Sequence, residues 1–232
     1  MSDPTASLTH DAWLSAQLDR PCFIAPPAWS AAVEAGLAAL PAGSFAYAKI
    51  PSCHVADVHS FEAAGFRLVD TNVTFERLGS GSPPSRAVRL ATPDDAAAVA
   101  RVARESYRFS RFHLDPRIGP ERAAAIKAAW TANFFAGRRG SRLLVADSRG
   151  EVAGFLLAID QDDRAVIDLI AVSPNHQRQG IAAALIEALS AASPAATTLV
   201  AGTQIANVPS VRMYETLGFR LAASAYVLHY HA

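Results

Sequence analysis

An apolar run, a short polar break and a second apolar run with helical spacing occupy residues 167–189. Ile167 to Val172 is almost wholly apolar, which predicts a buried strand. The run breaks at a Ser-Pro-Asn triplet and resumes from Gly180 to Leu189 with helix-forming residues, whose apolar members recur at helical spacing. The pattern therefore predicts a strand, a tight turn and a helix, and the other predicted elements are arranged around this unit.

The same patterns place helices between strands through the rest of the chain, which predicts an α/β fold with a mixed sheet and helices on its faces. From residue 86 the predicted order is β-α-α-β-β-β-α-β-α-β-β, with a loop at 109–116 and a closing hairpin of 219–221 with 225–230. Before residue 79 we predict helices at 29–40 and 55–64, a strand at 45–50, and a hairpin of 66–69 with 72–77.

Residues 79–85 read Gly-Ser-Gly-Ser-Pro-Pro-Ser, a composition that forms no packed element and is typical of a linker. We therefore expect two parts, residues 1–78 and residues 86–232, on either side of it.

Two segments of the chain resemble each other at an offset of 153 residues (208 − 55 = 153). Residues 208–221 agree with residues 55–68 at seven of fourteen positions, and the agreement includes a Gly-Phe-Arg-Leu run. A helix closed by glycine and followed by a strand is common, so chance similarity is the alternative. We favour a true repeat, in which the N-terminal copy has Phe61 where the C-terminal copy has Tyr214.

Charge and composition exclude several classes of function. The 21 basic and 21 acidic residues cancel, so neither a nucleic-acid face nor a polybasic membrane anchor is expected. No apolar run reaches the length of a membrane span, and the N-terminus lacks the features of a signal peptide. Cys22 and Cys53 have no metal-binding spacing and read as reduced thiols. We expect a cytoplasmic protein without a bound metal.

The turn before the second apolar run has features that favour phosphate binding. A helix N-terminus presents unpaired N–H groups and the positive end of the helix dipole, and Gly180 removes a Cβ that would hold a phosphate away from the backbone. The turn resembles motif A of the GNAT superfamily of N-acetyltransferases, Gln/Arg-x-x-Gly-x-Gly/Ala. The residues that carry the resemblance are Gln177, Arg178, Gln179, Gly180, Ile181 and Ala182.

This resemblance implies the GNAT acyl-CoA N-acyltransferase fold and acetyl-CoA as co-substrate. In the family, the amides of the turn hold the pyrophosphate, and the end of the preceding strand pairs with the pantetheine arm. The corresponding strand residues here are Ile170, Ala171 and Val172. Residues 1–78 have no counterpart of the turn, so the resemblance implies a degenerate, partial GNAT-like N-terminal domain.

A second motif lies downstream of the turn. Asn207, Ser210 and Tyr214 share one face of a predicted helix, at spacings i, i+3 and i+7. They resemble GNAT motif B, in which the Asn contacts pantetheine and the Tyr hydroxyl protonates the departing thiolate as general acid. The alternative is that Tyr214 is a core aromatic residue and Asn207 only a helix cap.

The sequence offers fewer signals for the general base and for the acceptor site. Period-two alternation puts Asp168 on the same strand face as Ile170. Asp168 is a candidate base that takes the amine proton directly or through water. The alternative is that it orients a neighbouring group without titrating. Arg108, Arg111 and His113 occupy the loop that lines the acceptor site in the family, and the arginines suit a phosphorylated acceptor. His229 and His231 read as surface residues rather than metal ligands.

Further stretches, including Tyr47–Pro51, Phe109–Phe112 and Ser224–Tyr230, resemble the family of dTDP-fucosamine acetyltransferases. That resemblance implies acetylation of the 4-amino group of a dTDP-linked amino-dideoxy sugar. The alternatives are a GNAT enzyme for another small amine or a protein N-terminus, and a non-catalytic acyl-CoA-binding module. We expect a small-molecule amine acceptor as the partner, and a homodimer is possible.

Overall fold

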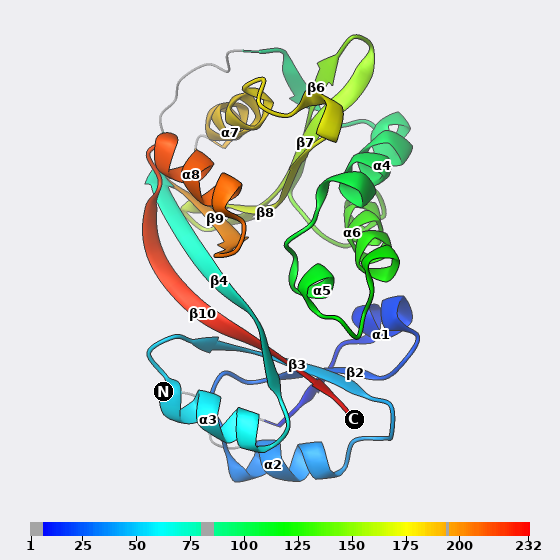
Figure 1. The fold of residues 1–232 in the computed structure, drawn as a ribbon. Helices are drawn as coiled ribbons and strands as arrows, with labels where there is room; N and C mark the ends of the chain where they lie inside the picture. The colour runs from blue at the N-terminus through cyan, green and yellow to red at the C-terminus, as the bar shows by residue number, and fades with distance from the viewer. Residues whose placement is uncertain (1–6, 80–85, 194) are drawn as a thin grey trace. The chain divides into compact units, whose positions relative to one another are not determined.

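The computed structural model describes residues 7–79, 86–193 and 195–232 (Figure 1). Contacts group them into two compact units that interleave along the chain. Unit 1 takes the chain up to Val73, with Gln204–Ala206 and Ala223–Ala232, and unit 2 takes Thr74–Thr203 and Asn207–Ala222. Residues 80–85 of the predicted linker lie outside the described residues, so a boundary there stays a prediction.

Unit 1 is a sheet with short helices. Its strands follow the order β1-β2-β3-β10-β4, with β2 parallel and β10 antiparallel to β3. Side chains from α2, α3 and the strands form one core, in which Val33, Phe61 and Ile50 are fully buried. The elements are β1 (Thr9–His10), α1 (Ala12–Leu18), β2 (Cys22–Ala25), α2 (Ala31–Ala38), β3 (Phe45–Pro51), α3 (Val55–Ala63), and parts of β4 (Arg67–Leu78) and β10 (Arg220–His231).

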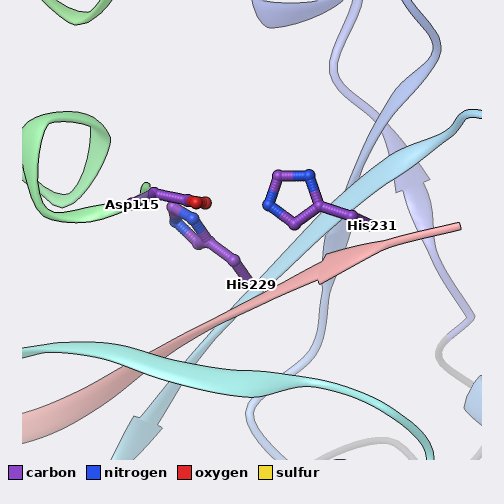
Figure 2. A group of neighbouring side chains, drawn as sticks. All are labelled: Asp115, His229 and His231. Atoms are coloured by element: carbon purple, nitrogen blue, oxygen red, sulfur yellow. The ribbon is translucent and has the colours of Figure 1, made fainter. Parts of the chain in front are cut away.

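The two histidines of β10 lie side by side in unit 1 (Figure 2). The expectation that both are surface residues is wrong for His229, which is only 2% exposed. Its ring meets the ring of Phe45 edge to face at 4.8 Å, and the ring of His231 meets Phe45 in the same way at 5.1 Å. Alternation along β10 places both histidines on the strand face that carries Phe45 in the neighbouring β3.

Unit 2 is a mixed sheet in the order β4-β9-β8-β7-β6-β5, with α4 and α6 on one side and α7 on the other (Figure 1). This confirms the predicted α/β class. The short helix α5 replaces part of the loop expected at 109–116. The elements are β5 (Val88–Leu90), α4 (Ala96–Ser106), α5 (Arg111–Leu114), α6 (Pro120–Phe135), β6 (Arg142–Ser148), β7 (Glu151–Gln161), β8 (Arg164–Val172), α7 (Ile181–Ala192), β9 (Thr198–Gln204) and α8 (Val208–Thr216), with 3₁₀ turns at Pro93–Asp95 and Pro174–His176.

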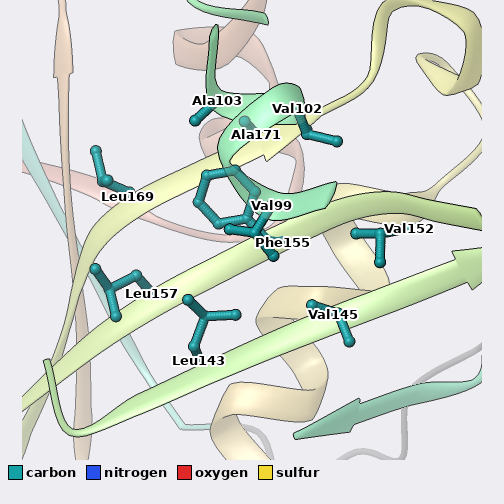
Figure 3. Close-up of a cluster of buried hydrophobic side chains, with 10 residues drawn as sticks. All are labelled: Val99, Val102, Ala103, Leu143, Val145, Val152, Phe155, Leu157, Leu169 and Ala171. Carbon is teal, nitrogen blue, oxygen red and sulfur yellow. The ribbon is translucent and has the colours of Figure 1, made fainter. Parts of the chain in front are cut away.

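The core of unit 2 lies between α4 and the central strands (Figure 3). Val99 and Val102 of α4 pack against Phe155 and Leu157 of β7 and against Leu169 of β8. Trp130 of α6 covers one side of this cluster. Apolar burial of this extent fixes β7 and β8 firmly, and these strands carry the turn before α7.

The internal repeat appears in the element boundaries. An offset of 153 residues carries β3 onto β9, α3 onto α8 and β4 onto β10, with both ends of every element in register. Gly65 and Gly218 close the two helices with φ of 101° and 81°, values in the left-handed region that suits glycine. Agreement of three consecutive elements to the residue supports a real repeat over chance similarity.

Both predicted hairpins in the repeat are wrong, because β4 and β10 are single twelve-residue strands. A tight turn needs glycine, proline or a residue with positive φ, and residues 70–72 and 222–224 provide none of these. Each strand instead continues into the other unit: Ala223–Ala232 complete unit 1, and Thr74–Leu78 belong to unit 2.

Candidate active site

The predicted strand–turn–helix is present as β8, the turn 173–180 and α7. Gln177 and Gln179 tie the turn together by donating side-chain hydrogen bonds to the carbonyl oxygens of Val172 and Asn175 at 3.3 and 3.4 Å. Arg178 and Gly180 both have positive φ, 59° and 78°, so the backbone adopts left-handed conformations at both residues. The turn is exposed, and a Cβ on Gly180 would meet nothing within 4 Å.

The last part of β8 separates from its parallel neighbour. β8 pairs with β9 only over Arg164–Ile167. Beyond that point β8 is paired only with β7, through Val172. The β9-facing edge of β8 is therefore unpaired from Ile170 to Val172. An extended ligand that adds to a sheet as a further strand needs such an unpaired edge.

Asp168 sits in a β-bulge, which the period-two interpretation did not foresee. Leu157 pairs with Leu169 and Ala158 pairs with Ile167, so Asp168 is the extra residue. Alternation fails here, and the placement of Asp168 on the face of Ile170 is wrong. The carboxylate reaches α6 instead, where it accepts a hydrogen bond of 3.1 Å from Nε1 of Trp130.

Asp168 also forms an ion pair with Arg139, just after α6. Nε and Nη2 of Arg139 donate to the two carboxylate oxygens at 2.7 and 2.6 Å. The Asp168 side chain is 10% exposed, whereas that of Arg139 is 41% exposed. Both oxygens of the Asp168 carboxylate are therefore engaged by one guanidinium, and this bidentate pair holds the side chains of Asp168 and Arg139 in place.

Asn207 and Tyr214 lie on α8. Asn207 caps the helix: its side-chain oxygen accepts from the amide of Ser210 at 3.4 Å, and its amide donates to Oγ1 of Thr203 at 3.3 Å. Tyr214 is 2% exposed, with its ring between Phe75 and Phe219 at 5.7 and 5.3 Å. Burial raises the pKa of Tyr214, so the phenol is protonated at neutral pH.

Tyr107, at the C-terminal end of α4, was not singled out in the sequence. Its hydroxyl donates to the carbonyl oxygen of Ile170 at 3.0 Å, on the unpaired part of β8. Its pKa is also raised by burial, by Tyr214 and by Asp168. The two phenols are therefore close enough to interact electrostatically.

Of the three predicted acceptor residues, Arg111 and His113 lie in α5 and Arg108 lies just before it. Arg108 donates to the carbonyl oxygen of Tyr107 at 2.8 Å, and the guanidinium of Arg111 lies 4.5 Å from the ring of Phe112. The ring Nδ1 of His113 is 2.6 Å from Oγ of Ser110. Burial, with the positive charges of Lys127 and Arg108, lowers the pKa of His113 to about 4, so this imidazole is neutral at pH 7.

The sequence analysis also missed Lys127, Trp130 and Arg139. Lys127 and Trp130 stand three residues apart in α6, so they share a face of the helix. A lysine within an apolar helical stretch was the available signal. The structure brings this pair together with Tyr107 and Asp168.

The fit of the turn before α7 to acetyl-CoA is shown by comparing it with the turn before α2. In the N-terminal copy α2 precedes β3, as α7 precedes β9. There α2 follows a loop containing Pro26 and Pro27, which lack amide hydrogens. Ser30 caps the amide of Val33 at 3.3 Å, and Asp57 binds the amide of Trp29 at 2.8 Å. The entry to α2 thus has its donors removed or occupied, whereas α7 begins at a glycine with no capping side chain and open space around it.

Comparisons with known proteins identify the family of the chain. The family model described as "Acetyltransferase (GNAT) family" matches residues 99–219, which include the turn, Asn207 and Tyr214. The chain therefore belongs to the GNAT family of acetyltransferases, and the prediction of an N-acetyltransferase fold and class is confirmed.

Two curated proteins are similar to parts of the chain. The chain is 35% identical over 150 residues to the spore coat polysaccharide biosynthesis protein SpsD of Bacillus subtilis (strain 168), covering 64% of this chain and 52% of that protein. It is 33% identical over 97 residues to the [ribosomal protein bS18]-alanine N-acetyltransferase of Escherichia coli (strain K12), covering 40% and 66%. The chain thus spans about half the length of the first relative.

Among solved structures, a GCN5-related N-acetyltransferase from Kribbella flavida has a TM-score of 0.60 at 13% identity, covering 90% of this chain and 80% of that one. This likeness supports the fold. Within the described part of the chain, no helix is long and apolar enough to cross a membrane.

Proposed function

We propose that the protein transfers the acetyl group of acetyl-CoA to the primary amine of a small anionic acceptor, with the 4-amino group of a dTDP-linked amino-dideoxy sugar as the leading candidate. The observation that carries this proposal is the group of cations beside the unpaired end of β8. The positive charges of Arg111 and Arg139 both act on Lys127 there, and Asp168, paired with Arg139, is the carboxylate among them. The similarity to a polysaccharide biosynthesis protein supports a sugar acceptor.

Acetyl-CoA, when bound, supplies a thioester that is open to attack by an amine. The amides from Gln177 to Ala182, with the N-terminal end of α7, hold its pyrophosphate, because unpaired N–H groups and the helix dipole favour negative charge. The edge from Ile170 to Val172, which has no partner in β9, binds the extended arm through backbone groups other than the carbonyl oxygens of Ile170 and Val172, since these accept from Tyr107 and Gln177. Asn207 and Ser210, at the start of α8, contact the same arm.

Tyr214 acts as the general acid. Its buried phenol keeps its proton at neutral pH and delivers it to the thiolate that leaves. Asp168 acts as a positioning residue: it fixes Arg139 and Trp130, and the amine loses its proton through water. This choice follows from the bidentate ion pair, which engages both carboxylate oxygens.

The relative that acetylates a ribosomal protein provides the second candidate, a protein N-terminus as the acceptor. Thiol release from acetyl-CoA distinguishes the candidates when it is measured with a dTDP-linked amino sugar, the same sugar without its nucleotide, and a peptide with a free N-terminal amine. We expect turnover with the nucleotide sugar that is lost in Tyr214→Phe. Turnover with the peptide and none with either sugar would overturn the sugar assignment, and CoA binding without turnover on any amine would favour the non-catalytic alternative.

A further inference from the structure

Lys127 is a buried ammonium group on α6 to which the proposed mechanism assigns no catalytic step. The residue is 9% exposed. Its Nζ lies 4.8 Å from the ring centroid of Tyr107 and 4.8 Å from that of Trp130. In the described part of the chain it makes no hydrogen bond or ion pair.

The charged neighbours of Lys127 do not neutralise it. Arg111 in α5 and Arg139 after α6 add positive charge, and the carboxylate of Asp168 on β8 is held by Arg139 and Trp130. Arg108 adds a further positive charge in the same region, and His113 is neutral at pH 7. The two aromatic faces offset only part of the cost of burying the charge. An unpaired buried charge is strongly unfavourable, so a counter-ion is missing from this set of residues.

We propose that Lys127 anchors an anionic group of the acceptor, a phosphate or a carboxylate, and that this contact selects acceptors that carry such a group. The proposal rests on the acetyltransferase function proposed above. Tyr107 connects the two places: its ring contacts Lys127 and its hydroxyl binds Ile170. The ammonium is therefore one side chain away from the strand edge at which the thioester is held.

The titration of Lys127 supports this role. Burial, followed by Arg111 and Arg139, lowers its pKa to about 8, against the partial opposition of Asp168. At pH 7 the group is therefore mostly protonated and able to bind an anion. An anion bound beside it favours the charged form, so binding raises its pKa, and anion affinity falls as the pH rises through about 8 in the free enzyme.

The first test uses the two lysines of the chain, Lys49 and Lys127, as a matched pair. Protein labelled with ¹³C at lysine Cε is saturated with CoA and titrated with dTDP, and separately with inorganic phosphate. We expect either anion to raise the pKa read from the Lys127 signal by about one unit and to leave that of Lys49 unchanged. Binding of dTDP or phosphate that moves neither signal, or no binding of either anion, would overturn the proposal.

The second test compares Lys127→Met and Lys127→Arg with Lys49→Met, using the acceptor that gives the fastest turnover. We expect Lys127→Met to raise the acceptor KM about tenfold, leave the KM of acetyl-CoA unchanged and raise Tm, because it removes an unpaired buried charge. A purely structural lysine would instead lower Tm and leave the acceptor KM in place, and that result would refute the anchor. Failure of nucleotide sugars alone, with inorganic phosphate still shifting the Lys127 signal, would overturn the sugar assignment and leave the anchor standing.

Discussion

The hydroxyl of Tyr107 donates a hydrogen bond of 3.0 Å to the carbonyl oxygen of Ile170, on the stretch of β8 that has no partner in β9. This bond satisfies a carbonyl oxygen where the sheet ladder has ended. It also ties the end of α4 to the strand that carries the proposed thioester site.

Replacing Tyr107 by Phe removes that donor and keeps the ring beside Lys127. We expect a loss of about 1–2 kcal/mol in the free energy of unfolding, because a partly buried carbonyl oxygen loses its partner. Urea unfolding followed by circular dichroism measures this loss. A variant as stable as the wild type would show that water replaces the phenol without cost.

Tyr214→Phe is expected to lower kcat by about a hundredfold or more while the KM of acetyl-CoA changes less than threefold, because only the proton donor is lost. The substitution is compatible with folding, since the repeat already has Phe61 at the matching position, buried against Phe66. Steady-state kinetics with thiol detection gives both parameters. Equal losses in kcat and in acetyl-CoA affinity would contradict the role as general acid.

Asp95 is a carboxylate of unit 2 whose ion pair makes a contribution to stability that depends on pH. Arg89 donates to both of its carboxylate oxygens, at 2.8 and 2.9 Å, and lowers the pKa of Asp95 to about 2. A carboxylate whose folded pKa lies below its unfolded value of about 4 contributes stability above pH 4, and that contribution is lost as the pH falls through about 2. Asp95 also accepts from the amide of Thr92 at 2.7 Å.

We therefore expect Asp95→Asn to cost about 1–2 kcal/mol at pH 7, and the difference from the wild type to shrink between pH 4 and pH 2. The exposed neighbour Asp94 provides the control, and Asp94→Asn is expected to have little effect. Denaturant midpoints measured across this pH range test both expectations. A gap between Asp95→Asn and wild type that stays constant down to pH 2 would rule out the ion pair as its cause.

Local patterns in the sequence predicted the parts of the site that depend on local chain geometry. The apolar run, the polar break and Gly180 are sufficient to predict β8, the turn and α7, because helix and strand periods and glycine conformations are properties of short segments. The offset between Phe61 and Tyr214 likewise appears in both sequence and structure.

Features that depend on pairing across the fold were not predictable in this way. The bulge at Asp168 arises from the register between β8 and β7. The residue pattern of β8 alone does not contain this register and therefore predicts the wrong strand face for Asp168. The cation group around Lys127 forms only when α4, α5 and α6 come together. The continuous strands β4 and β10 were read as hairpins because the pairing that extends them comes from distant residues.

The central claim is that the turn before α7 alone holds acetyl-CoA, and that the N-terminal copy does not. Calorimetric titration with CoA tests it most directly, using wild type, Gly180→Val, and Gly150→Val as a control with a similar φ of 82° and equally open surroundings. We predict one CoA per chain for wild type and Gly150→Val and no measurable binding for Gly180→Val, whose side chain fills the space of the pyrophosphate. Two CoA molecules per chain, or wild-type affinity in Gly180→Val, would contradict the account.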